Sequence, residues 1–370
     1  MAKNLVLCCD GTNNQFDGYH TNVVRTYKVC RHHSGQVTYY DPGVGTLPEP
    51  WSRTKFDKRM DMLRGLAYGD GFLDNISDAY RFLMLNYKPG DQVFLFGFSR
   101  GAFTARAVAA VLHSVGLLPQ GPGNLLPYAL AYWRRDLGPQ SPGSAVCAEF
   151  KTTIGRPCPV HFIGVWDTVS SVGYINNFRT FPHTAHNPEV SYVRHAVSID
   201  ERRSTFRQNL MSPVSQQQDI KNVYFAGGHS DVGGGYDPAE SELTKLAFQW
   251  MMREAIQCGL DVDQAALSQQ IYNVGAPPDP TAALHKSLKR LWWTGEVLPM
   301  RRYSFEDKKW HWHWLKAAFN QPRNVERSAK ERFVFLHQSV IERVKKCPGY
   351  RPENIPGDEA SLRAMFQIEN

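Results

Sequence analysis

The chain has 370 residues and a formal net charge of +7, with 42% hydrophobic and 21% charged residues. These values are typical of a soluble globular protein with a sizeable core. The seven cysteines are widely scattered, which excludes a disulfide framework and a paired-cysteine zinc site. The sequence contains no recognisable signal peptide and no apolar run of about 20 residues, so we expect the chain to be cytoplasmic as synthesised.

The positive charge gathers in one part of the chain. Residues 285–346 contain 15 lysines and arginines against 6 acidic residues, whereas the remainder is close to neutral. Two runs in this part, 285–293 and 308–315, mix basic and aromatic residues at helical spacing. We therefore predict that residues 275–370 form a basic, Trp-rich helical cap on a catalytic domain of residues 1–274. Such a cap would either dock on an anionic membrane surface or pack its rings on the catalytic domain. Nucleic acid is not an expected partner, because no reader fold accompanies the charge.

Short apolar runs alternate with helical patterns along much of the chain. The runs predicted as buried strands are 5–9, 93–96, 160–166 and 222–226. The helical patterns cover 63–87, with an interruption at 69–71, and 102–115, and a further helix is expected between 168 and 222. Segments 17–58 and 119–158 are rich in turn formers, so we expect loop insertions there. Strands alternating with helices predict an α/β fold with a mostly parallel central sheet and helices on both faces.

Ser99 stands between two glycines, where an apolar strand meets the helical pattern 102–115. The spacing Gly97-X-Ser99-X-Gly101 at a strand-to-helix turn is typical of a nucleophile elbow. The sharp turn strains the serine backbone, and the flanking glycines leave room for that conformation. We therefore predict that Ser99 is a catalytic nucleophile; the alternative is an ordinary serine in a βα loop.

A serine hydroxyl needs a base to take its proton and an acid to orient that base. Asp167 and His229 each follow a predicted strand, and glycines surround the histidine. In α/β-hydrolases the acid and the histidine follow the nucleophile in this order, each on a loop after a strand. The sequence thus predicts a Ser99–His229–Asp167 triad. Two alternatives stay open, namely Asp167 as a helix N-cap and Asp231 as the orienting acid.

An ester hydrolase also needs backbone N–H groups that bind the oxyanion. We expect one from Arg100, directly after the nucleophile, and another from Gly11 or Thr12 in the loop after the first strand. Asp10 opens this loop and also resembles the start of an aspartyl phosphatase motif, but Thr12 stands where that motif has its second aspartate. No P-loop is present, and the predicted chemistry needs neither a metal nor an organic cofactor. The residues expected to contact the substrate are Asp10, Trp166 and Asp231.

Several motifs in a fixed order carry a family resemblance. They are residues 10–13 (DGTN), 80–83 (YRFL), 97–102 (GFSRGA), 165–169 (VWDTV), 199–203 (IDERR) and 228–236 (GHSDVGGGY). Together they resemble the signature of the α/β-hydrolase family that includes phospholipase effectors of the bacterial type VI secretion system, the Tle-type lipases. The resemblance implies the same triad and an ester substrate, in particular a phospholipid. It also implies export by a contact-dependent secretion system, with an immunity protein or a secretion-apparatus component as partner.

Two other functions stay open. The chain could be a soluble carboxylesterase, or a non-catalytic membrane- or partner-binding protein on a hydrolase scaffold, because a fold does not guarantee a function. The charged run 200–203 could bind a charged group of a substrate, but local ion pairs are the favoured interpretation.

Overall fold

The computed structural model describes residues 2–11, 20–43, 70–121, 123–136, 141–169, 173–174, 177–178, 181–203, 206–287, 300–304, 309–313 and 323–370. Its central feature is a sheet of eight parallel strands in the order β12-β11-β8-β7-β4-β3-β1-β2. The strands are β1 (Asn4–Cys9), β2 (Gln36–Asp41), β3 (Gln92–Phe98), β4 (Val160–Trp166), β7 (Val190–Ser198), β8 (Asp219–Phe225), β11 (Val334–His337) and β12 (Gln367–Glu369).

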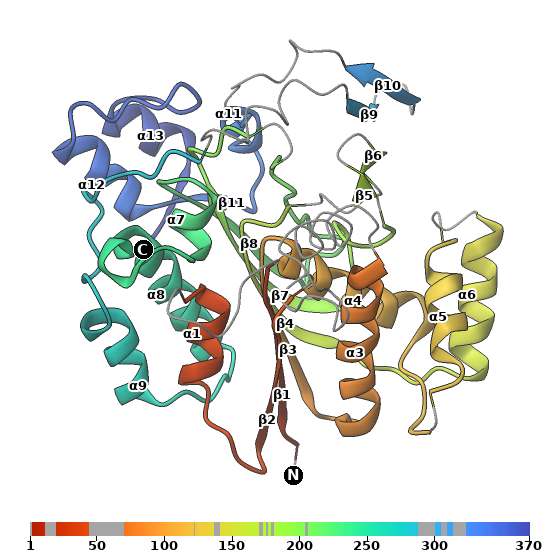
Figure 1. Cartoon of the computed structure of the whole chain (residues 1–370). Coiled ribbons are helices and arrows are strands. Elements are labelled where there is room, and N and C mark those ends of the chain that lie inside the picture. The colour runs from red at the N-terminus through yellow and green to blue at the C-terminus, as the bar shows by residue number, and fades with distance from the viewer. Residues whose placement is uncertain are drawn as a thin grey trace, which may run out of the picture.

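Helices cover both faces of this sheet (Figure 1). One side carries α3 (Asp70–Asn86), α4 (Arg100–Val115), α5 (Leu126–Trp133) and α6 (Pro142–Thr153), and the other carries α1 (Asn22–Val29), α8 (Glu242–Gln257) and α9 (Gln264–Ser268). Side chains alternate along a strand, so Leu5 and Leu7 of β1 belong to the first core, whereas Val6 and Cys8 belong to the second. Burial on both faces explains why the central strands are continuously apolar. The predicted α/β fold with a parallel sheet between two helical layers is therefore confirmed.

A second, smaller sheet has the order β10-β9-β6-β5. Its strands are β5 (Gly173–Tyr174), β6 (Asn177–Phe178), β9 (Met300–Ser304) and β10 (Lys309–His313). The helical expectation for 308–315 is therefore wrong over β10. Basic and aromatic residues strictly alternate there, and a period of two fits a strand better than a helix. Most of the other basic run, 288–293, lies outside the described residues.

The four predicted strands are present as β1, β3, β4 and β8, and the predicted helix after Ser99 is α4. The pattern 63–87 is observed as α3, and its residues 63–69 lie outside the described part. Three expectations need correction. Segment 17–58 contains α1 and β2, and segment 119–158 contains α5 and α6, in place of continuous loops. Between 168 and 222 the described residues include the long strand β7 where a helix was expected.

The C-terminal part of the chain adds β11 and β12 to the main sheet, together with α11 (Val325–Ser328), α12 (Gln338–Lys346) and α13 (Glu359–Met365). Its apolar side chains form a third core with Ile199 and Tyr224. The division into a catalytic domain of residues 1–274 and a cap of residues 275–370 stays a prediction. Within the described residues, no helix combines the length and apolar character needed to cross a bilayer.

Candidate active site

The order in which strands are added to the sheet reverses between β1 and β3. From β1 the chain moves to β2 on one side, and from β3 onward each main-sheet strand is added on the other side. In open α/β sheets, ligands bind beyond the carboxyl ends of the strands at such a switch point. The loops that leave β1 and β3 at this point carry Asp10 and Ser99. Two of the residues singled out in the sequence therefore lie where this architecture binds ligands.

Ser99 joins β3 to α4 with φ 58° and ψ −120°, a left-handed conformation that is strained for any residue with a side chain. A Cβ atom on Gly97 would lie 2.5 Å from the carbonyl oxygen of Gly101. A Cβ atom on Gly101 would overlap the backbone carbonyls at the end of β1. The N–H of Ser99 donates to the carbonyl of Trp166 at 3.1 Å, which ties the turn to β4. Glycine is thus required at both flanks, and Ser99 remains partly exposed at the tip of the turn.

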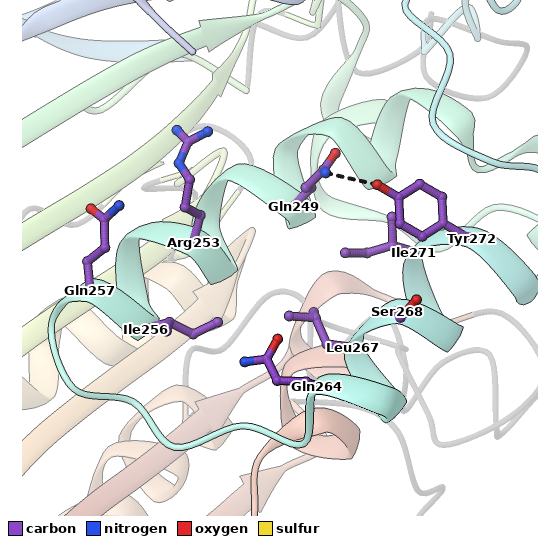
Figure 2. A pocket seen from close by; sticks show the side chains of 9 residues that line it. All are labelled: Gln249, Arg253, Ile256, Gln257, Gln264, Leu267, Ser268, Ile271 and Tyr272. Carbon is purple, nitrogen blue, oxygen red and sulfur yellow. Dashed lines mark hydrogen bonds between the residues drawn. The ribbon is translucent and has the colours of Figure 1, made fainter.

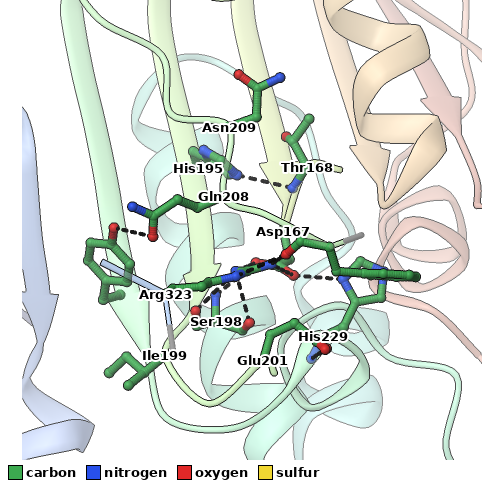
Figure 3. Close-up of polar contacts among 12 residues, drawn as sticks. Asp167, Thr168, His195, Ser198, Ile199, Glu201, Gln208, Asn209, His229 and Arg323 are labelled. Carbon is green, nitrogen blue, oxygen red and sulfur yellow. Dashed lines mark hydrogen bonds and ion pairs between the residues drawn. The ribbon is translucent and has the colours of Figure 1, made fainter. Parts of the chain in front are cut away.

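Asp167 follows β4 directly, and its Oδ2 accepts a hydrogen bond from Nδ1 of His229 at 2.6 Å (Figure 3). His229 begins the short helix α7 (His229–Gly233), and both side chains are buried. The imidazole packs against Phe98, next to the predicted nucleophile, with ring centroids 4.6 Å apart. In the described structure Ser99 Oγ and His229 Nε2 are not hydrogen-bonded to each other, and such contacts often form only when substrate binds. The fold thus brings the three predicted triad residues to one edge of the sheet.

Arg323 is a charged residue of this site that the sequence analysis missed. Its guanidinium donates to both carboxylate oxygens of Asp167, with Nη1–Oδ1 at 2.5 Å and Nη2–Oδ2 at 3.0 Å. Burial alone would raise the pKa of Asp167, but the charge of Arg323 and the hydrogen bond from His229 hold that pKa well below its usual range. No local signal distinguishes this arginine from the other basic residues of its region.

A second histidine fixes the backbone beside the acid. Asp167 has φ 38°, and the next residue, Thr168, donates its N–H to Nε2 of His195 at 3.1 Å. Because Nε2 accepts, the proton lies on Nδ1 and is donated to the side-chain oxygen of Asn222 at 3.1 Å. Burial and the charge of Arg106 lower the pKa of His195 to about 3, so this ring stays neutral. The network stabilises the strained turn that carries the acid.

The motif at 199–203 supports the loop that carries His229. Buried Glu201 accepts hydrogen bonds from the backbone N–H of His229 at 3.2 Å and from the guanidinium of Arg203 at 2.9 Å. The interpretation of this motif as local ion pairs is thereby confirmed for Glu201 and Arg203. Burial lowers the pKa of His229 below its ordinary value, and Arg203 adds to this effect, while Asp167 and Glu201 oppose it. The ring is therefore neutral near pH 7 and able to accept a proton.

The predicted oxyanion donors differ in their surroundings. Arg100 is the first residue of α4, where backbone N–H groups have no partner within the helix. The N–H of Gly11 instead donates to Oδ1 of its neighbour Asp10 at 2.7 Å. Oδ2 of Asp10 accepts from the hydroxyl of Thr21 at 2.7 Å, so this buried carboxylate holds the loop after β1 together. Thr12 lies outside the described residues.

Trp166 does not have the surroundings of a residue that contacts a substrate. Its indole is fully buried and stacks on Phe96 with ring centroids 6.3 Å apart. Its Nε1 donates to the carbonyl of Ala247 in α8 at 3.5 Å. The expected substrate contact is therefore replaced by core packing, and Trp166 serves the site through its carbonyl, which binds the Ser99 turn.

Asp231 forms a second aspartate–histidine pair. Its Oδ1 accepts a hydrogen bond from Nδ1 of His285 at 2.6 Å, and its Oδ2 accepts from the N–H of Gly228 at 2.9 Å. Asp231 is 1% exposed, so it faces these partners rather than solvent. The carboxylate bonded to the ring of His229 is that of Asp167, so Asp231 is not the group that orients this ring.

A groove of about 450 Å³ lies between α8 and the segment formed by α9 and the π-helical turn η2 (Gln269–Asn273) (Figure 2). Its lining residues are Gln249, Arg253, Ile256, Gln257, Gln264, Leu267, Ser268, Ile271 and Tyr272. None of the predicted site residues lines it, and we assign it no function. In the described part of the chain, no group of three His, Cys, Asp or Glu side chains is arranged to hold a metal ion.

Comparison with known proteins identifies relatives of this chain. Residues 3–254 match the model of a family described as the catalytic domain of Tle1-like phospholipase effectors of the type VI secretion system. An uncharacterized protein of Saccharomyces cerevisiae is 38% identical over 234 residues. That match covers 58% of this chain and 33% of the yeast protein, so the chain spans about a third of the length of this relative. Ser99, Asp167 and His229 fall within the family match, whereas Arg323 lies beyond it.

Two solved structures are also similar. An uncharacterized protein from Pseudomonas aeruginosa superposes with a TM-score of 0.45 at 19% identity, over 75% of this chain and 49% of that one. The Tle1 effector bound to the VgrG spike of the type VI secretion system superposes with a TM-score of 0.35 at 21% identity, over 65% of this chain and 52% of that one.

Proposed function

The chain belongs to the family of Tle1-like catalytic domains of type VI secretion phospholipase effectors, and from this membership we propose that it is a serine hydrolase that cleaves carboxylic esters of phospholipids. Ser99 is the nucleophile, His229 is the general base and Asp167 is the orienting acid. The observation that carries the proposal is the 2.6 Å bond between Asp167 and His229 beside a serine held at φ 58°.

In the proposed reaction, Ser99 Oγ attacks the carbonyl carbon of the ester while Nε2 of His229 accepts the hydroxyl proton. The carboxylate of Asp167 keeps the bond from Nδ1 and stabilises the imidazolium that forms. Collapse of the tetrahedral intermediate breaks the bond to the leaving alcohol, which takes the proton from His229. Water then attacks the acyl-enzyme, again with His229 as base, and releases the fatty acid.

The N-terminus of α4 supports stabilisation of the oxyanion. The N–H of Arg100 belongs to the first turn of that helix, where the helix dipole adds partial positive charge. Because the N–H of Gly11 is bonded to Asp10, we retain Thr12 as the proposed second donor.

We propose that the side chain of Arg100, the residue after the nucleophile, selects a phosphate-containing ester over a simple one. It is partly buried, and burial lowers its pKa to about 10. No charged group among the described residues offsets this desolvation. A charged guanidinium that has no carboxylate partner among the described residues is suited to bind the phosphate of a phospholipid.

The decisive experiment measures fatty-acid release from vesicles of phosphatidylethanolamine and phosphatidylglycerol. It compares the unaltered chain with Ser99→Ala and with Ser215→Ala, a change at an exposed serine of the loop that precedes β8. We expect release by the unaltered chain and by Ser215→Ala, and none by Ser99→Ala. Equal release by all three proteins would refute the serine mechanism.

Two other outcomes would assign a different function. Hydrolysis of soluble short-chain esters without release from vesicles would identify a carboxylesterase. Inactivity on both substrates would favour a non-catalytic binding protein on a hydrolase scaffold.

The proposed partners are an anionic membrane surface, an immunity protein and a component of a secretion apparatus. The solved Tle1 effector is bound to a VgrG spike, and we propose a secretion-apparatus contact of this kind for the present chain. Co-sedimentation with anionic vesicles at low and high salt tests the membrane contact, because attraction of basic side chains to lipid weakens as salt screens it.

A further inference from the structure

Arg323 holds the carboxylate of Asp167 from the side opposite to His229 (Figure 3). Its two terminal nitrogens bind the two carboxylate oxygens separately, so two hydrogen bonds fix the plane of the acid. Oδ1 of Asp167 also accepts the backbone N–H of Ser198 at 2.9 Å, and Oδ2 binds the imidazole. Each carboxylate oxygen thus accepts two hydrogen bonds, and three of these four come from groups other than the histidine.

The guanidinium is itself fixed, because each of its nitrogens has an acceptor. Nη1 donates to the carbonyl and the hydroxyl of Ser198, both at 3.0 Å. Nε and Nη2 donate to the carbonyl of Phe206 at 3.1 and 2.5 Å. The ring of Phe206 packs edge-on against His229, with centroids 4.8 Å apart. The side chain of Arg323, only 4% exposed, thus anchors the acid and also the residue that bounds the imidazole.

Arg323 comes from a distant part of the chain. It is 156 residues from Asp167 and lies outside the matched residues 3–254. The part that carries it also adds β11 and β12 to the sheet beyond β8. This C-terminal part therefore contributes a charged side chain to the interior of the site.

We propose that Arg323 is the positioning residue of the catalytic acid, and that through it the C-terminal part of the chain completes the active site of the matched catalytic domain. This inference rests on the proposed triad. Arg323 does not touch the substrate. It holds Asp167 in the plane that aligns Nδ1 of His229, and this alignment directs Nε2 toward Ser99.

The charged groups around His229 predict how removal of Arg323 would change the pKa of this histidine. They are Asp167 after β4, Glu201 and Arg203 after β7, and Arg323 behind the acid. Arg323 offsets part of the negative charge of Asp167, which weakens the attraction between that acid and an imidazolium. Loss of Arg323 would leave the full charge of Asp167 facing His229 and raise the pKa of the histidine. The other titratable neighbours of Asp167 and Arg323 are His195 and Tyr224, which stay neutral near pH 7.

The test compares variants of the full 370-residue chain. Arg323→Met removes both the positive charge and the paired hydrogen bonds of the guanidinium. Arg323→Lys keeps the charge but cannot form the paired hydrogen bonds. Arg194→Met is the matched control, since Arg194 is also 4% exposed and pairs with buried Glu254 at 2.5 Å outside the site. The measurements are kcat and KM on a soluble ester and the NMR titration of His229, whose signal is identified by its loss in His229→Gln.

We expect Arg323→Met to lower kcat about 10²-fold with KM within about threefold of the starting value, as for a misplaced catalytic group. It should raise the titration midpoint of His229 by about one pH unit. Arg323→Lys should titrate His229 at the same midpoint as the unaltered chain. Its kcat should nevertheless fall almost as far as that of Arg323→Met. Arg194→Met should change neither quantity at temperatures where it is folded.

A folded Arg323→Met protein with unaltered kcat and an unaltered His229 midpoint would overturn the proposal. Equal losses in Arg323→Met and Arg194→Met would also overturn it, by assigning Arg323 to stability alone. Should Arg323→Met fail to fold, an Arg323→Lys protein with unaltered kcat would overturn the proposal. If the unaltered chain hydrolyses no ester, the proposed function fails, yet the His229 titration still decides the role of Arg323.

Discussion

Among the described residues, two buried aspartates pair with a histidine at the same distance. Asp167 binds Nδ1 of His229 at 2.6 Å, and Asp231 binds Nδ1 of His285 at 2.6 Å. The pairs differ at the other ring nitrogen. Nε2 of His285 faces the carboxylate of Glu240 at 3.3 Å, whereas no hydrogen bond to Nε2 of His229 is found among the described residues.

The surroundings of the two rings differ as well. The ring of His285 stacks on Tyr236 with centroids 3.9 Å apart, and its side chain is 18% exposed. The ring of His229 is buried against Phe98, which precedes the strained serine. A short bond from an acid to a histidine therefore does not identify a base by itself. A base is identified by a second ring nitrogen that stays available beside a nucleophile. The Asp231–His285 pair instead anchors the segment before residue 288 to α7.

The largest expected effect separates the two histidines. His229→Gln should lower kcat for ester hydrolysis about 10⁴-fold or more, because the base is lost. His285→Gln should leave kcat within about threefold of the starting value. Steady-state kinetics on one soluble ester would measure both. Comparable losses in the two variants would break the distinction between the pairs.

The two aspartates should differ in what they stabilise. Asp167→Asn should lower kcat about 10³- to 10⁴-fold, because the amide cannot stabilise the imidazolium. Asp231→Asn should instead lower the free energy of unfolding by about 1–3 kcal/mol, since buried donors lose a charged acceptor. Urea unfolding and kinetics on the same preparations would show this exchange of roles. A catalytic defect in a stable Asp231→Asn protein would contradict it.

Arg100 sharpens the comparison on the substrate side, because it is the cation next to the nucleophile. Arg100→Met should lower kcat/KM for phospholipid about 10- to 100-fold, the value of a charge-assisted hydrogen bond. It should change kcat/KM for an uncharged short-chain ester less than about threefold. Parallel assays on the two substrates give the ratio. An equal loss on both substrates would exclude recognition of phosphate by this side chain.

The smallest expected effect is a shift along the pH axis. His229 must be neutral to accept the serine proton, and burial lowers its pKa below the ordinary histidine value of about 6.5. Activity should therefore persist below pH 6.5 and fall only as the pH drops through the lowered pKa. His285→Gln should leave this acid limb in place. If the activity of the unaltered chain already fell above pH 6.5, the net charge around His229 would differ from the one described.

The sequence predicts the parts of this site that depend on local order. Ser99, Asp167 and His229 follow strands whose continuous apolar runs reflect burial on both faces, and parallel strands place their carboxyl ends at one edge. Strand β7 is hidden in the sequence because it contains Arg194 and His195. These two polar side chains are buried, and their partners Glu254 and Asn222 come from elsewhere in the chain.

Arg323 shows the limit of such reasoning. It stands in a basic region where every lysine and arginine looks alike in sequence, and its partner is 156 residues away. Trp166 and Asp231 illustrate the opposite error. Both adjoin predicted catalytic residues in the sequence. Side chains alternate along a strand, however, so that of Trp166 points into the core. The turn after Gly228 directs Asp231 toward His285. Proximity in sequence does not determine the direction of a side chain.

The most direct test of the central claim is covalent labelling with a fluorophosphonate, followed by mass spectrometry of the labelled peptide. The account predicts stoichiometric labelling at Ser99 in the unaltered chain and in His285→Gln, and labelling slowed at least about 10²-fold in His229→Gln. Labelling at another serine, or equal rates in the two histidine variants, would contradict the assignment of Ser99 and His229 as an activated pair.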